Sequence, residues 1–327
     1  MHTASHQADR AQPLVGVGSC LVGEPVRFNG DHKRSNPHIN KLGRHVILQT
    51  FCPEVAIGLG VPRDPIRIVE IDGRRHLRDS DTQQQDYTTA IESYAENVLH
   101  QHPELCGYIL VKGSPSCGYE RVKRYHEKGN IIASDSMGIY AQRLRQQNPL
   151  LPMEEDGRLY DHGLRESFVS RVYLYHDWQQ FSREPYTAAG LLQFYSRYKY
   201  LIMAHSVPMY QQLGRLMADL KRQDLNRVAQ DLIGGMMDAL QRVASAAGHT
   251  NVLQHLQGYL KKTLSTDEKQ ELSEVIDQFR RGIVPLITPL TLLQHHFRRS
   301  PDNYIGQQTF MAPYPGELAL RSFVTPT

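Results

Sequence analysis

The sequence predicts an α/β domain followed by an all-α domain. Short apolar runs alternate with helical patterns in the first half of the chain, and three of those runs end in small-residue loops that carry a cysteine. Beyond residue 187, segment after segment has the apolar spacing of a helix. Alternating strands and helices favour a parallel sheet, and 327 residues suggest two domains.

The α/β domain is expected to span residues 13–180. Helices are predicted at 86–102, where Pro103 follows the helix end, and at 138–149. Three apolar runs between and before them are predicted to be strands. This order predicts a Rossmann-like parallel sheet with helices. The strands, each with its cysteine loop, are PLVGVGSC (13–20), HVILQTFCPE (45–54) and CGYILVKGSPSCG (106–118).

The all-α domain is expected to span residues 187–327. The segment SREPYTAAG breaks the helical pattern after a helix at 164–181 and marks the boundary. Residues 1–12 lack an apolar run and are predicted to be a disordered tail. Further helices are predicted at 191–205, 208–220, 225–245, 252–264, 266–282 and 289–299.

The composition is ordinary for a globular protein, with 40% hydrophobic and 22% charged residues. A net charge of +3 permits a nucleic-acid partner but does not require one. The longest apolar stretch, IVPLITPLTLL, is too short to span a bilayer, and the N-terminus is not a signal peptide. We therefore expect a cytoplasmic protein without a membrane partner, in which the four cysteines do not form disulfides.

Three cysteines share one sequence context. Cys20, Cys52 and Cys117 each follow a predicted strand at a turn, and loops after parallel strands meet at one edge of a sheet. Spacing alone leaves open whether they are structural thiols or ligands. Three thiolates without a fourth protein ligand suit a [4Fe–4S] cluster with one open iron, although sulfur ligands also bind zinc. Cys106 lies at the opposite end of the third strand and is interpreted as a packing thiol.

Polar residues accompany these cysteines. Glu54 stands two residues from Cys52 and is either a general base or a surface charge. Ser114 and Ser116 either bind a substrate heteroatom or close the turn. Arg27 and Lys33, in the charged loop after the first cysteine, are candidate contacts to a phosphate or base, and solvated charges otherwise.

The segments CLVGEPVRFNG, CPEVAIGLGVPRDP and KGSPSCG resemble, in order, the motifs of the thiouracil desulfurase family, over residues 14–165. The resemblance implies that Cys20, Cys52 and Cys117 hold a [4Fe–4S] cluster, whose open iron takes the sulfur of a thiolated pyrimidine. It also implies that Glu54 and Ser114 are catalytic. Exchange of C=S for C=O by water, with release of sulfide, needs no net electrons. The cluster would then act as a Lewis acid while Glu54 activates water.

The helical half, from about residue 187 to the end, resembles a second, uncharacterised family that occurs alone or fused to the first. Matching segments include FYSRYKYLIMAHS, NVLQHLQGYLKKTLS and YIGQQTFMAPYPGELALR. Such two-domain fusions look like bacterial desulfidases that convert 4-thiouridine in tRNA to uridine. The resemblance therefore implies thiolated tRNA as the partner of this chain.

Basic residues cluster in the helical half among aromatic ones. Basic groups position phosphates, and aromatic rings stack on unpaired bases, although such residues otherwise form solvated faces and helix cores. The predicted RNA contacts are Arg197, Lys199, Lys261, Lys262, Arg280, Arg281, Arg298 and Arg299.

Other functions stay open at this point. One alternative is a desulfurase of free thiolated pyrimidines such as 2-thiouracil, whose turnover should be less sensitive to salt than that of tRNA. Another is a non-catalytic, cluster-containing RNA-binding sensor, in which Glu54 and Ser114 would not matter. A zinc hydrolase is the third. The scattered histidines of the helical half show no spacing that supports a second metal site.

Overall fold

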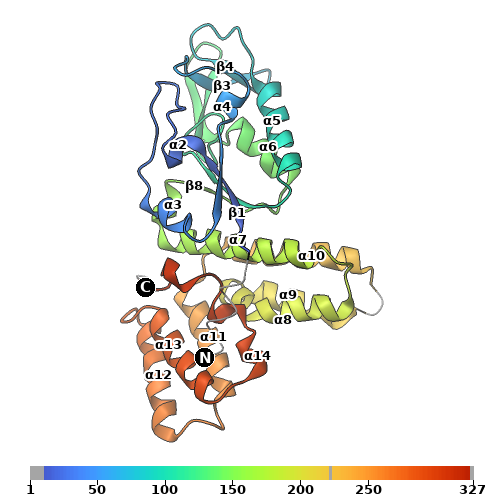
Figure 1. Cartoon of the computed structure of the whole chain (residues 1–327), viewed down its shortest axis with the longest axis vertical. Helices are drawn as coiled ribbons and strands as arrows, with labels where there is room; N and C mark the ends of the chain where they lie inside the picture. Colours follow the sequence, from blue (N-terminus) through green and yellow to red (C-terminus); the bar gives the residue numbers. More distant parts are fainter. Residues whose placement is uncertain (1–10, 221–222, 325–327) are drawn as a thin grey trace. The chain divides into compact units, whose positions relative to one another are not determined.

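The computed structural model describes residues 11–220 and 223–324. The chain divides into two compact units, one of residues 12–161 and one that contains the chain from residue 162 onward. Figure 1 shows an α/β unit and a unit made of helices, as the sequence predicts. The predicted tail at 1–12 lies outside the described residues except for its last two. No helix of the described residues is long and apolar enough to cross a membrane.

The main sheet of the α/β unit has four parallel strands in the order β2-β1-β5-β8. The central strand β5 is buried along its whole length, and β1 is buried at four of its five residues. Burial on both faces explains why these strands read as continuous apolar runs. The strands are β1 (Leu14–Gly18), β2 (Ile47–Phe51), β5 (Leu105–Leu110) and β8 (Met153–Glu155).

Two long helices, α5 (Thr88–Gln101) and α6 (Ile139–Gln147), pack against each other beside the sheet (Figure 1). Both lie where the sequence predicts a helix. The shorter helices follow strands or fill loops: α2 (Ser19–Val22), α3 (Pro37–Leu42), α4 (Pro53–Ala56) and a 3₁₀ turn at Arg158–Tyr160.

A second, mixed sheet in the same unit was not predicted. Its order is β4-β3-β6-β7, with two antiparallel hairpins joined by the parallel pair β3–β6. Charged residues dominate one of its strands, β4, which has the sequence RRHLRD and buries only its leucine. A strand like β4 lacks the alternation of apolar and polar residues that identifies a strand from sequence. The strands are β3 (Ile66–Ile71), β4 (Arg74–Asp79), β6 (Val122–His126) and β7 (Ile131–Ser136).

The second unit is built from helices, and each of its six predicted helical segments overlaps an observed helix. Side chains at the N-caps of α8 to α12 accept a hydrogen bond from the first turn of their helix, which satisfies backbone donors that have no partner within the helix. The helices are α7 (His162–Phe181), α8 (Ala188–His205), α9 (Val207–Ala218), α10 (Leu225–Gln241), α11 (Ala246–Tyr259), α12 (Thr266–Arg280), α13 (Ile287–Arg299) and α14 (Asn303–Gly306), with 3₁₀ turns at Thr309–Met311 and Gly316–Leu318.

Helix α7 belongs to this helical unit, whereas the sequence analysis grouped it with the α/β domain. It packs against α10, and the Ser167 hydroxyl donates a hydrogen bond to the carbonyl of Leu240. Glu166 accepts hydrogen bonds from Tyr314 (2.9 Å) and from Nε of Arg321 (2.7 Å), which ties the C-terminal segment to α7. The helical pattern identifies α7 as a helix but does not reveal which neighbours it packs against.

Candidate active site

The ends of three parallel strands bring three thiols to one edge of the main sheet. Cys20 lies in α2 directly after β1, and Cys52 is the N-cap of α4 directly after β2. Cys117 lies in the loop after β5. Each thiol is within electrostatic reach of another: Cys52 acts on the pKa of Cys20, and both act on that of Cys117. The three residues therefore follow the ends of three neighbouring parallel strands, and their role as ligands of one group stays a prediction.

Burial dominates the chemistry of these thiols. Burial raises the pKa of Cys20 to about 11, with a further contribution from Cys52. It also raises the pKa of Cys52, and it raises that of Cys117 well above its usual range. Without a ligand the thiols are therefore protonated near neutral pH, and binding of a metal group must release their protons. Cys106 lies inside β5 and is fully buried, in agreement with a packing thiol.

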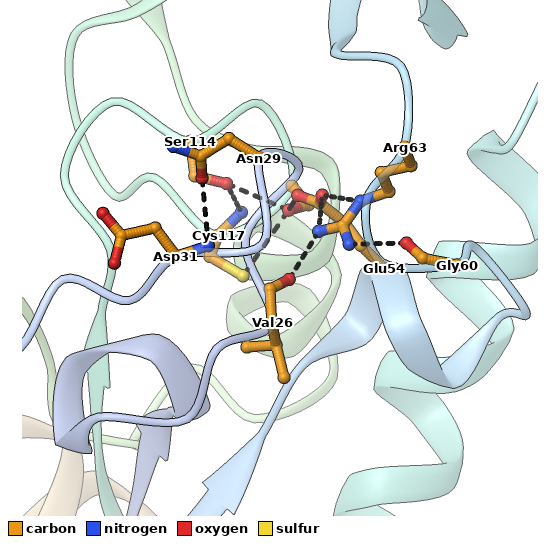
Figure 2. Close-up of polar contacts among 9 residues, drawn as sticks. Val26, Asn29, Asp31, Glu54, Gly60, Arg63, Ser114 and Cys117 are labelled. Carbon is orange, nitrogen blue, oxygen red and sulfur yellow. Dashed lines mark hydrogen bonds and ion pairs between the residues drawn. The ribbon is translucent and has the colours of Figure 1, made fainter.

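Glu54, in the first turn of α4, is held as a buried ion pair (Figure 2). Its Oε2 accepts hydrogen bonds from Nε (3.0 Å) and Nη2 (2.6 Å) of Arg63. Its Oε1 accepts one from the Ser116 hydroxyl at 2.5 Å. The side chains of Glu54 and Arg63 are only 14% and 7% exposed, so the carboxylate is fixed by three donors and is not a solvated surface charge.

Arg63 is a residue of this site that the sequence analysis did not single out. Besides Glu54 it binds two backbone carbonyls, that of Val26 through Nη2 (2.9 Å) and that of Gly60 through Nη1 (3.0 Å). Figure 2 shows its guanidinium between the carboxylate and these two loops. The only sequence signal for it was its place in the PRDP segment of the second motif. Arg63 therefore locks the loop after Cys20 to the segment that carries Glu54.

The two serines before Cys117 form a directed chain of hydroxyls that ends on Glu54. The Ser114 Oγ accepts a hydrogen bond from the backbone N–H of Cys117 (3.1 Å) and lies 3.0 Å from the Ser116 Oγ. Because Ser116 donates its single proton to Glu54, the Ser114 hydroxyl is the donor to Ser116. Ser114 is half-buried, whereas Ser116 is fully buried. The full burial of Ser116 therefore favours a role as a link between Ser114 and Glu54 over direct contact with a substrate.

The cysteine loop is packed closely onto the start of α6. The carbonyls of Pro115 and Ser116 accept hydrogen bonds from the backbone N–H groups of Ile139 (3.1 Å) and Ala141 (3.3 Å). A Cβ on Gly138 would lie 2.4 Å from the Ser116 carbonyl oxygen, so only glycine fits there. These contacts hold the serines and the thiol in one conformation.

The predicted substrate contacts Arg27 and Lys33 lie beside Cys20, and both positive charges lower the pKa of its thiol. Lys33 also donates its backbone N–H to the carbonyl of Cys20 (2.7 Å), and its Nζ lies 3.3 Å from Oδ2 of Asp156. Asp156 is buried at the end of β8 and accepts a hydrogen bond from the N–H of Lys112 (2.7 Å). Sequence reasoning missed Asp156 because β8 has only three residues.

The donor set fits a cluster bound at separate metal atoms. Among the described residues, no three histidine, cysteine or carboxylate side chains converge as ligands of one metal ion. A single zinc requires all its sulfur ligands at about 2.3 Å from one point. An iron–sulfur cluster instead receives each thiolate at a different iron. Cys20, Cys52 and Cys117 are the residues that could hold such a group.

Comparisons with known proteins show which family the α/β unit belongs to. The model of the family described as 2-thiouracil desulfurase matches residues 15–156, which include the three thiols, Glu54 and both serines. An uncharacterized protein of Bacillus subtilis (strain 168), YbbK, is 30% identical over 139 residues, which are 41% of this chain and 90% of that protein. This chain belongs to the 2-thiouracil desulfurase family. Family membership indicates an enzyme that removes sulfur from a thiolated pyrimidine.

Three further matches come from a second family model, a curated protein and a solved structure. The family model described as "Protein of unknown function (DUF1722)" matches residues 199–315 of the desulfurase. An uncharacterized protein of Escherichia coli (strain K12), YbgA, is 32% identical over 157 residues, 48% of this chain and 93% of that protein. A solved [4Fe-4S]-dependent thiouracil desulfidase, TudS, is 28% identical and covers 46% of this chain and 94% of its own, with a TM-score of 0.37.

The predicted RNA contacts of the desulfurase differ in their surroundings. Lys199 lies between two rings, with its Nζ 5.0 Å from the ring centroid of Tyr200 and 4.8 Å from that of Tyr304. Lys261, Lys262 and Arg298 are exposed. The other four pair with carboxylates, as Arg197–Asp177, Arg280–Asp277, Arg281–Asp277 and Arg299–Glu268. A role of these residues in RNA binding stays a prediction.

Proposed function

We propose that this desulfurase converts 4-thiouridine in tRNA to uridine and releases sulfide, in a non-redox reaction that depends on a [4Fe–4S] cluster. The observation that carries the proposal is the set of three thiols at one sheet edge, beside a carboxylate that three donors hold in place. The reaction consumes water: the ring carbon loses its bond to sulfur, gains a bond to oxygen, and the two protons leave with the sulfide. No electrons are needed.

A cluster held by Cys20, Cys52 and Cys117 would supply an open, thiophilic iron that acts as a Lewis acid toward the substrate sulfur. Cys20 and Cys117 are buried and Cys52 is half-buried, which suits this role, because a site with little water strengthens the attraction between a cation and a bound sulfur.

The residues around the thiols transfer the proton of the attacking water and hold the carboxylate in place. Glu54 is the general base for the attacking water, as the carboxylate at the end of the hydroxyl chain. Ser114, the half-buried end of that chain, takes the proton of the water and passes its own proton to Ser116. Ser116 in turn passes its proton to Glu54. Arg63 holds the carboxylate in position and keeps the side chain turned toward Ser116.

The helical unit supports a tRNA substrate. Lys199, Lys261, Lys262 and Arg298 offer positive charges without a carboxylate partner among the ion pairs of the described residues, and Tyr259 exposes 43% of its surface nearby in sequence. Such residues bind phosphates and stack on unpaired bases. A free base would need no second unit of this kind.

Anaerobic turnover of bulk bacterial tRNA tests the proposal, with loss of the near-ultraviolet absorbance of 4-thiouridine as the signal. We expect turnover by the wild-type protein and none by Glu54→Gln with an intact cluster. Full turnover by the Glu54→Gln variant would show that another group is the base.

Desulfuration of a free thiolated pyrimidine such as 2-thiouracil is the second candidate. It is favoured by the description of the family and by the fact that the α/β unit alone carries the thiols, Glu54 and both serines. Salt separates the two candidates, because phosphate contacts weaken steeply as salt rises while binding of a neutral base does not. Turnover of tRNA that does not respond to salt would favour the free base.

A further inference from the structure

Exposed apolar side chains lie on the segments that form the active site. Phe28 is 41% exposed, Val61 41% and Val55 38%. Phe28 follows Arg27 in the loop after Cys20, Val55 follows Glu54, and Val61 lies two residues before Arg63. Exposed apolar groups gathered at a functional site are typical of a surface that receives a ligand.

Backbone contacts place two of these segments against each other. The N–H of Arg63 donates a hydrogen bond to the carbonyl of Phe28 (2.8 Å), and its guanidinium binds the carbonyl of Val26. A Cβ on Gly30 would lie 3.9 Å from Cγ1 of Val61. Figure 2 shows the loop with Val26, Asn29 and Asp31 beside Cys117 and Glu54. The position of the Phe28 loop is therefore fixed by the same arginine that fixes the carboxylate.

Arg27 lies against the aromatic ring, in the loop that follows Cys20. Its guanidinium carbon lies 5.7 Å from the ring centroid of Phe28, and in the same loop the backbone N–H of Lys33 donates a hydrogen bond to the carbonyl of Cys20 (2.7 Å). A flat ring and a planar guanidinium are the two surfaces on which proteins stack nucleobases. A pyrimidine that stacks there leaves its polar edge free, and the thiols and Glu54 lie beside the same loop.

We propose that Phe28, with Arg27, is the stacking surface for the reacting thiolated pyrimidine ring. This inference rests on the proposed function, since the class of substrate is taken from it. The ring of Phe28 supplies the area, Arg27 supplies a planar positive charge, and Val61 borders the ring site on the neighbouring segment. Because stacking acts on the ring faces, it does not distinguish the thio substrate from the oxo product.

The test compares Phe28→Ala and Phe28→Tyr with Ile131→Ala, which removes a more exposed apolar side chain from β7. All holoproteins are first matched by iron content and visible absorbance. We expect Phe28→Ala to raise KM roughly 5- to 150-fold with little change in kcat, for both free 2-thiouracil and thiolated tRNA. Phe28→Tyr and Ile131→Ala should behave like the wild-type protein.

Calorimetric titration of each holoprotein with uridine gives a readout that does not depend on turnover. Kd should rise in Phe28→Ala by the same factor as KM. Unchanged Kd and KM would overturn the inference, and so would a change confined to tRNA, because Phe28 would then touch a flanking nucleotide. If the wild-type protein binds uridine but turns over no thiolated pyrimidine, the proposed function fails while the Kd comparison still decides the role of Phe28.

Discussion

Replacement of Arg63 by methionine should destabilise the α/β unit and disable the carboxylate at the same time. The substitution removes two hydrogen bonds to Oε2 of Glu54 and one each to the carbonyls of Val26 and Gly60. It keeps an unbranched side chain of similar length, so packing is largely retained. The Glu54 carboxylate then stays only 14% exposed and has lost its positively charged partner.

The structure gives the size of the effect. Breaking a buried ion pair by removal of one partner costs about 3–5 kcal/mol, because the remaining charge stays buried without compensation. Glu54→Gln alone leaves the guanidinium without its anion and should also destabilise the unit. The double variant removes both charges. We therefore expect its loss of unfolding free energy to be smaller than the sum of the two single losses, by about 2 kcal/mol or more. Part of the loss remains, since the two carbonyls still lack their donor.

Urea unfolding of the four proteins of this cycle, under identical anaerobic conditions, measures the coupling. Cys106→Ala serves as a control for a general response of the unit, because its thiol is buried away from the ion pair in β5. A change below about 1 kcal/mol in Arg63→Met, or strict additivity in the double variant, would refute the reasoning that Arg63 and Glu54 form a tightly coupled pair.

Three further outcomes are expected. Ser116→Ala should lower kcat by about 100-fold or more, measured by steady-state kinetics with KM as the internal control, since the hydroxyl chain to Glu54 is broken while the substrate surface is untouched. Burial lowers the pKa of His249 to about 3, so the native helical unit binds fewer protons than the unfolded chain below the ordinary histidine pKa. The free energy of unfolding of the helical unit should therefore be highest above pH 6.5 and fall by about 2 kcal/mol between pH 7 and pH 5. Urea titrations of His249→Gln should show a weaker dependence of this free energy on pH. Turnover of tRNA should decrease linearly on a log–log plot against salt, with a smaller slope after Lys261→Ala and Lys262→Ala, whereas turnover of free 2-thiouracil should stay constant.

The sequence predicts the thiol edge well because the physics behind it is local. Buried parallel strands read as continuous apolar runs, and the residues that follow them must meet at one edge. Cys20, Cys52 and Cys117 could therefore be grouped without knowledge of any contact. The helices of the second half could be predicted equally well, because apolar spacing and N-cap residues are properties of each segment by itself.

Other features depend on contacts between distant segments and could not be predicted. The pairing of Arg63 with Glu54 exists because two loops close on each other, and no pattern in either loop specifies the partner. Ser116 and Ser114 look alike in sequence, and only burial separates their roles. The mixed sheet was not predicted because a strand such as β4 buries only a single side chain. The chain position of α7 likewise says nothing about its packing against α10.

The central claim is that the three thiols and Glu54 carry out a desulfuration that needs water but no electrons. The most direct test is one anaerobic reaction without reductant, in which loss of 4-thiouridine from tRNA and release of sulfide are measured together. We expect equal amounts of both over many turnovers by the wild-type protein, and neither with Cys117→Ala. Sulfide release that requires a reductant, or turnover that survives in Cys117→Ala, would contradict it.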